Sequence, residues 1–138
     1  MRQLRRRNIE VITHIILGLP GERPEDSLAS VDLAVKAGTT GVKLQLLHIL
    51  RGTELYRQYK AGKVPVLSLD EYIKWLFACI RRLPPNIVIH RITGDAPKLY
   101  LEAPLWSADK KTVLNTINRA MEQQQLRQGQ AAISFDAP

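Results

Sequence analysis

The stretch THIILGLPGE, residues 13–22, decides how the chain is organised. It lies within an apolar run from Ile9 to Leu17 that has apolar or β-branched residues on both faces, which predicts a parallel strand covered on both sides. The glycine-proline turn that follows leads into a helix whose first position suits Pro24. Such a strand, turn and helix would place backbone N–H groups and the Glu22 carboxylate at the carboxyl end of a parallel strand. Ligands bind at that end in α/β folds.

The remainder of the chain alternates in the same way between strand and helix patterns. Further strands are expected at 41–48 and 87–92, and helices at 2–7, 24–38, 54–61, 69–83 and 109–126. This order predicts an α/β fold with about three parallel strands, flanking helices and right-handed crossovers. Residues 98–106 are expected to be irregular, with Trp106 folded back onto the core. We expect one folded unit over 1–126 and a flexible tail over 127–138.

The strand at 41–48 has two chemically different faces. Val42, Leu44 and Leu46 share one of them, whereas Lys43 and Gln45 share the other. If the apolar face meets the helices, the polar face lines an interior that holds water or a polar ligand. The alternative is that Lys43 and Gln45 satisfy each other or lie near an open edge of the sheet.

The strand at 87–92 runs into a second group of polar residues beside a glycine. His90, Arg91 and Asp95 together could bind an anion or transfer a proton. The alternative is an ion pair between Arg91 and Asp95 that fixes the loop, with His90 packed in the core.

Composition limits the class of protein. The chain has 138 residues, of which 45% are hydrophobic and 24% charged, as in a globular domain. No apolar run reaches the roughly 18 residues of a membrane span, and no apolar segment follows the basic start as in a secretory signal. The single cysteine, Cys79, excludes an internal disulfide framework and is expected to be a buried, inert thiol. A cytoplasmic protein without membrane contact is therefore expected.

The formal net charge of +7 is concentrated partly at the start of the chain. The arginines there are Arg2, Arg5, Arg6 and Arg7. They could bind RNA phosphates or an anionic substrate, or simply form the solvated end of a helix. No aromatic residue lies among them, so base stacking has no support. A stand-alone basic module that binds RNA or protein is the alternative function.

Several motifs together carry a family resemblance. HIILGLPGE (14–22) resembles the GLPGE segment of radical SAM enzymes, and KLQLLHILRGT (43–53) resembles the next strand and its Gly-Thr turn. VIHRITGDAP (88–97), preceded by Glu71-Tyr72 and followed by Ala103-Pro104 and Trp106, resembles the YhcC-like branch. That branch is related to the Elongator-catalytic-subunit and MiaB/HemN groups. The resemblance covers about residues 8–122.

The resemblance implies the C-terminal half of a TIM-like barrel, a partial (β/α) barrel, that binds S-adenosylmethionine on a four-iron four-sulfur cluster. The reduced cluster would release a deoxyadenosyl radical that abstracts hydrogen from a substrate. It places Gly18, Leu19, Pro20 and Gly21 along the cofactor, followed by the Glu22 carboxylate. It implies that Lys43, Gln45 and His48 line the cofactor or substrate space, and that His90, Arg91 and Asp95 contact the substrate. It identifies no catalytic residue.

The chain departs from this family pattern in its cysteines. The family motif C-x-x-x-C-x-x-C is absent, so no residue here is expected to bind the cluster. The resemblance therefore implies a chain that is inactive alone and needs an N-terminal half carrying the motif. Half a barrel also leaves two exposed sheet edges, which predicts poor solubility or pairing with another chain. A metal-independent enzyme with a phosphate ligand at 18–22 ranks last, because the turn lacks the glycines and Lys-Ser/Thr of a P-loop.

Overall fold

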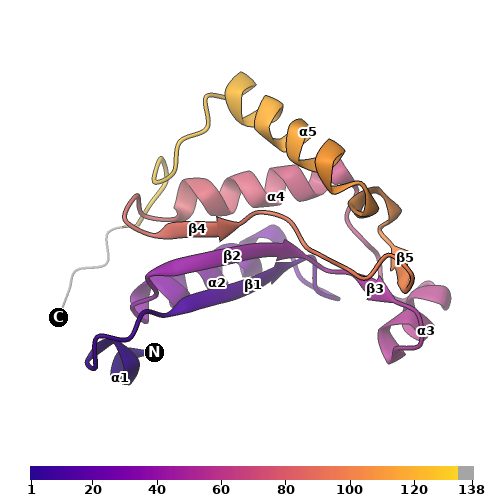
Figure 1. Cartoon of the computed structure of the whole chain (residues 1–138), viewed down its shortest axis with the longest axis horizontal. Helices are drawn as coiled ribbons and strands as arrows, with labels where there is room; N and C mark the ends of the chain where they lie inside the picture. The colour runs from indigo at the N-terminus through magenta and orange to yellow at the C-terminus, as the bar shows by residue number, and fades with distance from the viewer. Residues whose placement is uncertain (134–138) are drawn as a thin grey trace.

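The computed structural model describes residues 1–133, Arg2 by its backbone alone, and shows a sheet with helices on one face (Figure 1). The strands β1 (Ile12–Leu17), β2 (Gly41–Leu46) and β4 (Val88–Arg91) form a three-stranded sheet in the order β1-β2-β4. Both neighbouring pairs are parallel. The predicted α/β class with three parallel strands and flanking helices is confirmed.

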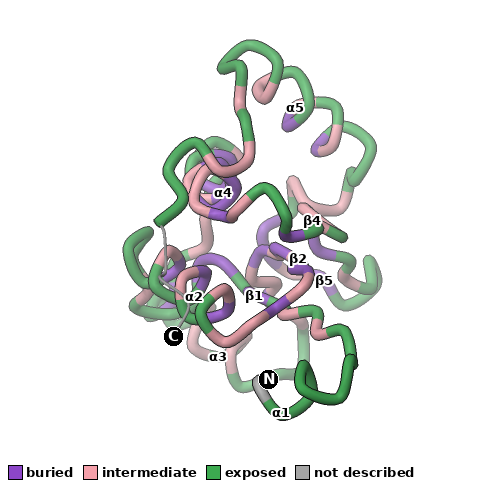
Figure 2. Tube along the Cα trace, turned by 90° about the vertical axis from the view of Figure 1, so that its left-hand side faces the viewer, coloured by how far each residue is buried: buried purple, intermediate pink, exposed green. Residues whose placement is uncertain are grey.

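The helices α2 (Pro24–Lys36) and α4 (Leu69–Arg82) pack on the sheet and on each other, and α5 (Lys110–Gln123) packs on α4. The hydrophobic core lies between these helices and the sheet. The fully buried members of this core include Leu17, Val42, Leu44, Tyr72, Leu76, Phe77 and Ile117. Figure 2 shows the outer surface of α5 as exposed. The Arg82 guanidinium also donates to both carboxylate oxygens of Asp32, at 2.7 and 2.6 Å, and so joins α4 to α2.

Local signals set the helix ends as the sequence predicts. Ser68 and Glu71 form a reciprocal capping box at the start of α4, and these hydrogen bonds lower the pKa of Glu71. The Thr53 hydroxyl accepts from the Tyr56 N–H at 3.1 Å and begins α3 (Glu54–Lys60). The short α1 (Arg2–Arg5) is followed by Asn8, which has a φ of 57°.

The prediction that 98–106 is irregular is wrong in part. Within this segment β5 (Leu101–Ala103) pairs antiparallel with β3 (Ile49–Leu50), and the short helix η1 (Leu105–Ala108) follows. Strands of two or three residues are too short to show an alternating pattern, so the sequence gives no sign of them. Trp106 does fold back onto the core, where its indole N–H donates to the Leu67 carbonyl at 3.0 Å.

The prediction that β1 is covered on both sides is also wrong. Ile15 and Leu17 are buried against the helices, but Ile12 and Ile16 are 40% and 42% exposed and His14 is exposed with them. β-branched residues favour a pleated strand whether or not both faces are covered, so the apolar run indicated a strand more reliably than its burial. One face of the sheet is therefore open in the described part of the chain.

The end of the described chain returns to the sheet. The Gln128 side chain donates to the carbonyls of Pro84 and Ile87, each at 2.7 Å. Residues 134–138 lie outside the described residues, so the flexible tail expected over 127–138 stays a prediction. In residues 1–133 no helix combines the length and the apolar character needed to cross a membrane.

Candidate functional site

A closed turn follows β1 at its carboxyl end. Gly18 and Gly21 have φ values of 82° and 77°, a region that favours glycine. One carboxylate oxygen of Glu22 accepts from the N–H groups of Gly18 and Leu19, each at 2.9 Å. The other oxygen accepts from the hydroxyl of Ser27 at 2.9 Å, in the first turns of α2. Glu22 therefore ties the turn to the helix, and these two N–H groups already have a partner.

The turn still presents a free surface beyond Glu22. Leu19 is 44% exposed, and Pro20 and Gly21 are exposed beside it. A Cβ added at Gly21 would meet nothing within 4 Å. Of the four residues that the resemblance places along the cofactor, Leu19, Pro20 and Gly21 are thus the accessible ones, whereas Gly18 is buried against Leu67.

Lys43 and Gln45 lie on the open face of the sheet. Their neighbours Val42 and Leu44 are fully buried on the other face, which confirms the predicted parity of β2. β2 is the middle strand, and among the described residues no hydrogen bond joins Lys43 to Gln45. Both alternatives for this pair, mutual satisfaction and a position at an edge, are therefore wrong. His14 lies opposite Lys43 in the register and adds to the polar face.

The loops that follow β2 and β4 meet at His48. This side chain lies against Gly94, where an added Cβ would overlap the imidazole ring. Burial lowers the pKa of His48 from its ordinary value of 6.5, and the negative charge of Asp95 partly opposes that shift. The structure thus brings together His48 and Asp95, which the sequence had assigned to separate groups.

His90 and Asp95 lie at opposite ends of β2. The exposed His90 covers Gly41, the first residue of β2, because the register shifts between Val42 and Lys43. Asp95 lies beyond the other end of β2 and pairs with Lys110 at 3.4 Å. The predicted gathering of His90, Arg91 and Asp95 is not observed, and the alternative of an Arg91–Asp95 ion pair with a core His90 is wrong too. A bulge of this kind leaves no mark in the sequence.

Cys79 is buried, with 1% of its surface exposed, as predicted. Burial, and to a smaller degree the Glu22 charge, raises the pKa of the Cys79 thiol to about 12. Because the thiolate is the form that binds iron, Cys79 does not fit the ligand set of an iron–sulfur cluster. Across residues 1–133, no group of three or more His, Cys, Asp or Glu side chains is placed to hold a metal ion.

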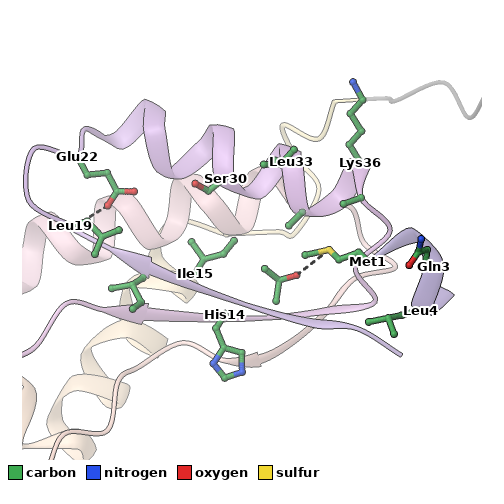
Figure 3. A pocket seen from close by; sticks show the side chains of 14 residues that line it. Met1, Gln3, Leu4, His14, Ile15, Leu19, Glu22, Ser30, Leu33 and Lys36 are labelled. Carbon is green, nitrogen blue, oxygen red and sulfur yellow. Dashed lines mark hydrogen bonds between the residues drawn. The ribbon is translucent and has the colours of Figure 1, made fainter. Parts of the chain in front are cut away.

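A groove of about 980 Å³ runs along the outer edge of β1, and the sequence did not locate it (Figure 3). β1 forms its floor, and the flank of α2 forms one wall through Ser30 and Leu33. Leu33 is 68% exposed and lies off the apolar stripe of α2, which is the signal that could have found the groove. Leu19 and Glu22 line one end, so the turn after β1 borders this groove as well as the open face.

Comparison with known proteins agrees with this architecture. The chain is 36% identical over 129 residues to YtqA of Bacillus subtilis and 33% identical over 119 residues to YhcC of Escherichia coli. These alignments cover 94% and 86% of this chain but only 40% and 38% of the two relatives. The fold superimposes on an N-terminally truncated Elp3 of Methanocaldococcus infernus with a TM-score of 0.73 and 20% identity, over 92% of this chain and 30% of that one.

The superposition confirms the partial barrel, since the sheet and its helices match a piece of the fold of that larger chain. The model of the Radical_SAM C-terminal domain matches residues 39–123, from two residues before β2 through the last residue of α5. This match takes in β2, β4 and the helices that cover them, which is more than half of the chain. The chain belongs to the Radical_SAM C-terminal domain family.

Proposed function

We propose that this chain forms one wall of a barrel that binds S-adenosylmethionine and a substrate. The observation that carries the proposal is the open face of a parallel sheet in a member of a radical SAM family, with Lys43 and Gln45 on its middle strand, beside a hydrogen-bonded turn at the carboxyl end of β1. A polar face enclosed in a barrel is costly unless water or a polar ligand covers it. The carboxyl ends of the strands are where α/β proteins place that ligand.

Two sets of residues would form this binding wall. Leu19, Pro20 and Gly21 present the accessible surface of the turn and would contact the adenine or ribose, while Glu22 acts as a positioning residue that keeps the turn closed. Lys43, Gln45 and His48 would line the cofactor or substrate space beyond this turn.

The cluster would need cysteines other than the one within residues 1–138. The only cysteine of the chain is buried with a raised pKa, so the residues of this chain do not fit the cluster. We propose a partner that carries the three-cysteine motif, and we propose that the chain is inactive without it.

Co-expression with a polypeptide that carries the motif tests the proposal. After iron reconstitution and reduction, the complex should release deoxyadenosine from S-adenosylmethionine, and either chain alone should not. Leu19→Asp should weaken binding of labelled S-adenosylmethionine to the complex, whereas Leu99→Asp, at a 76% exposed site far along the chain, should leave it unchanged. A complex that takes up iron yet never releases deoxyadenosine would show that the enzymatic proposal is wrong.

A second candidate rests on the start of the chain. Arg6 and Arg7 are exposed and form no ion pair among the described residues, so they are free to contact RNA phosphates. Binding that weakens steeply as salt rises, and that falls in Arg6→Gln/Arg7→Gln, would support an RNA-binding module. Binding that salt does not weaken would exclude it.

A further inference from the structure

The bulge in β4 places two successive basic residues on the open face of the sheet. Ile89 and Ile92 pack against the hydrophobic core, on the side of the helices. His90 and Arg91 lie between these two isoleucines, and the shift in register lets both of them face the other way. His90 covers Gly41 on that face, where an added Cβ would collide with the imidazole ring. A regular strand would present only one of two successive residues there.

Three basic side chains form a row across this open face. Lys43 of β2 lies opposite His14 of β1 on one side and opposite Arg91 of β4 on the other. Paired residues of parallel strands point to the same face, and Figure 3 shows the His14 ring on the side of β1 that is turned away from α2. Neighbouring strands are about 4.8 Å apart, so the row spans about 10 Å and its side chains can reach one small ligand. We call His14, Lys43 and Arg91 the basic row.

The basic row has no acidic partner in the described chain. The other side chains of these strands on the open face are Ile12, Ile16, Gln45, Val88 and His90. Neither Lys43 nor Arg91 forms an ion pair within residues 1–133, although both are half-buried. Like charges on directly opposite strand residues repel each other and destabilise a sheet. A bound anion would offset this repulsion.

The position of the basic row does not depend on the edges of the sheet. Lys43 belongs to the middle strand, which is already paired on both sides, so strands added at either edge would leave the row in place. The row also lies apart from the turn that would contact the cofactor. Gly18 follows His14 by four residues, which is about 13 Å along an extended strand. A ligand in the row therefore lies nearer the amino ends of the strands than the turn does.

We propose that the basic row binds an oxyanion group of the substrate, a carboxylate or a phosphate. The Arg91 guanidinium has paired N–H donors that match two oxygens of such a group, and the Lys43 ammonium adds a compact charge beside it. The His14 imidazole supplies a further N–H donor from the third strand. That the oxyanion belongs to a substrate rests on the proposed function, whereas the binding of an oxyanion by the row does not.

NMR titration of the isotope-labelled chain tests the site with inorganic phosphate and with acetate, each compared with sodium chloride at the same ionic strength. The amides of His14, Lys43 and Arg91 should shift and saturate, with phosphate if the row selects a phosphate and with acetate if it selects a carboxylate. Lys43→Gln and Arg91→Gln should each raise the dissociation constant about tenfold, because each removes a charge-assisted hydrogen bond. Shifts that sodium chloride reproduces, or that both variants retain, would overturn the proposal.

Two matched variants and a stability measurement serve as controls. Lys63→Gln and Arg119→Gln make the same changes at exposed positions outside the sheet and should leave the dissociation constant unchanged. The probe that binds should raise the Tm of the wild-type chain but not that of Lys43→Gln. In chloride, Lys43→Gln should unfold at the same temperature as the wild type or higher, because one repulsive charge is gone. A clearly lower Tm would show that Lys43 supports the fold and would overturn its assignment to a ligand.

S-adenosylmethionine is the third probe, because its methionine part also carries a carboxylate. Shifts of the basic row with this probe would assign the row to the cofactor and overturn its assignment to a substrate. The titrations are independent of deoxyadenosine release. A chain that binds neither phosphate nor acetate, in a complex that releases deoxyadenosine, would overturn the basic row alone. A chain that binds one of them, in a complex that never releases deoxyadenosine, would overturn the proposed function and leave the oxyanion site.

Discussion

The carboxylate of Glu22 accepts a hydrogen bond of 2.9 Å from the hydroxyl of Ser27, a side chain with no exposed surface. Its second oxygen holds the N–H groups of Gly18 and Leu19. One side chain thus satisfies three donors that belong to a strand end, a turn and a helix. The shape of the turn after β1 depends on this carboxylate.

Glu22→Ala should therefore destabilise the chain. Removing the carboxylate leaves a buried hydroxyl and two turn N–H groups without an acceptor, and the expected loss is about 2 kcal/mol in the free energy of unfolding, measured by urea denaturation. Ser27→Ala removes one donor together with its need for a partner, so it should cost about 1 kcal/mol or less. Equal losses in the two variants would contradict the assigned role of Glu22.

Stability should fall in mild acid because of His48. Its pKa is lowered in the folded chain by burial, so the unfolded chain binds the proton more readily below pH 6.5. The stabilisation is fully present above that pH and is lost as the pH falls through the folded pKa. His48→Gln should flatten the pH dependence of the unfolding free energy between pH 6.5 and the folded pKa.

A substitution of the neighbouring carboxylate, Asp95, provides a control for the His48 prediction. Because the Asp95 charge raises the pKa of His48 against the effect of burial, Asp95→Asn should lower that pKa further. NMR titration of the imidazole resonances measures both values directly. A midpoint for His48 at or above 6.5 in the wild-type chain would rule out this account.

Cys79 should not react in the folded state. Its thiol is buried and its pKa is raised to about 12, so very little thiolate exists at neutral pH. A colorimetric thiol reagent should label the chain only after denaturant is added, and the labelling rate in water should follow the unfolding equilibrium. Rapid labelling of native protein would show that the thiol is accessible.

The sequence was informative wherever a pattern is local and repeated. Alternation along β2 predicted that Lys43 and Gln45 share a face, and the helix expected at 69–83 begins where Ser68 and Glu71 form a capping box. These signals involve only a few neighbouring residues, so they can be recognised in the sequence without knowledge of the fold.

What the sequence missed depends on packing between distant segments. The bulge that moves His90 over Gly41, the approach of Gly94 to His48 and the pairing of β3 with β5 all join residues far apart in the chain. The open face of β1 was missed for a related reason, because an apolar strand has the same sequence pattern whether or not another element covers its second face. The groove beside β1 was missed for the same reason.

The start of α2 provides the last prediction, because Arg23 occupies its N-cap position and forms no side-chain capping hydrogen bond. Threonine at this position accepts from a free N–H of the first turn, so Arg23→Thr should stabilise the chain by about 1 kcal/mol in urea denaturation. The Arg23–Asp26 ion pair that is lost is 74% and 49% exposed and contributes little. Arg23→Ala removes the same ion pair without adding a cap and should change stability little. A threonine variant no more stable than the alanine variant would show that the helix start is already satisfied, by the Asp26 carboxylate that accepts from the Arg23 N–H at 2.8 Å.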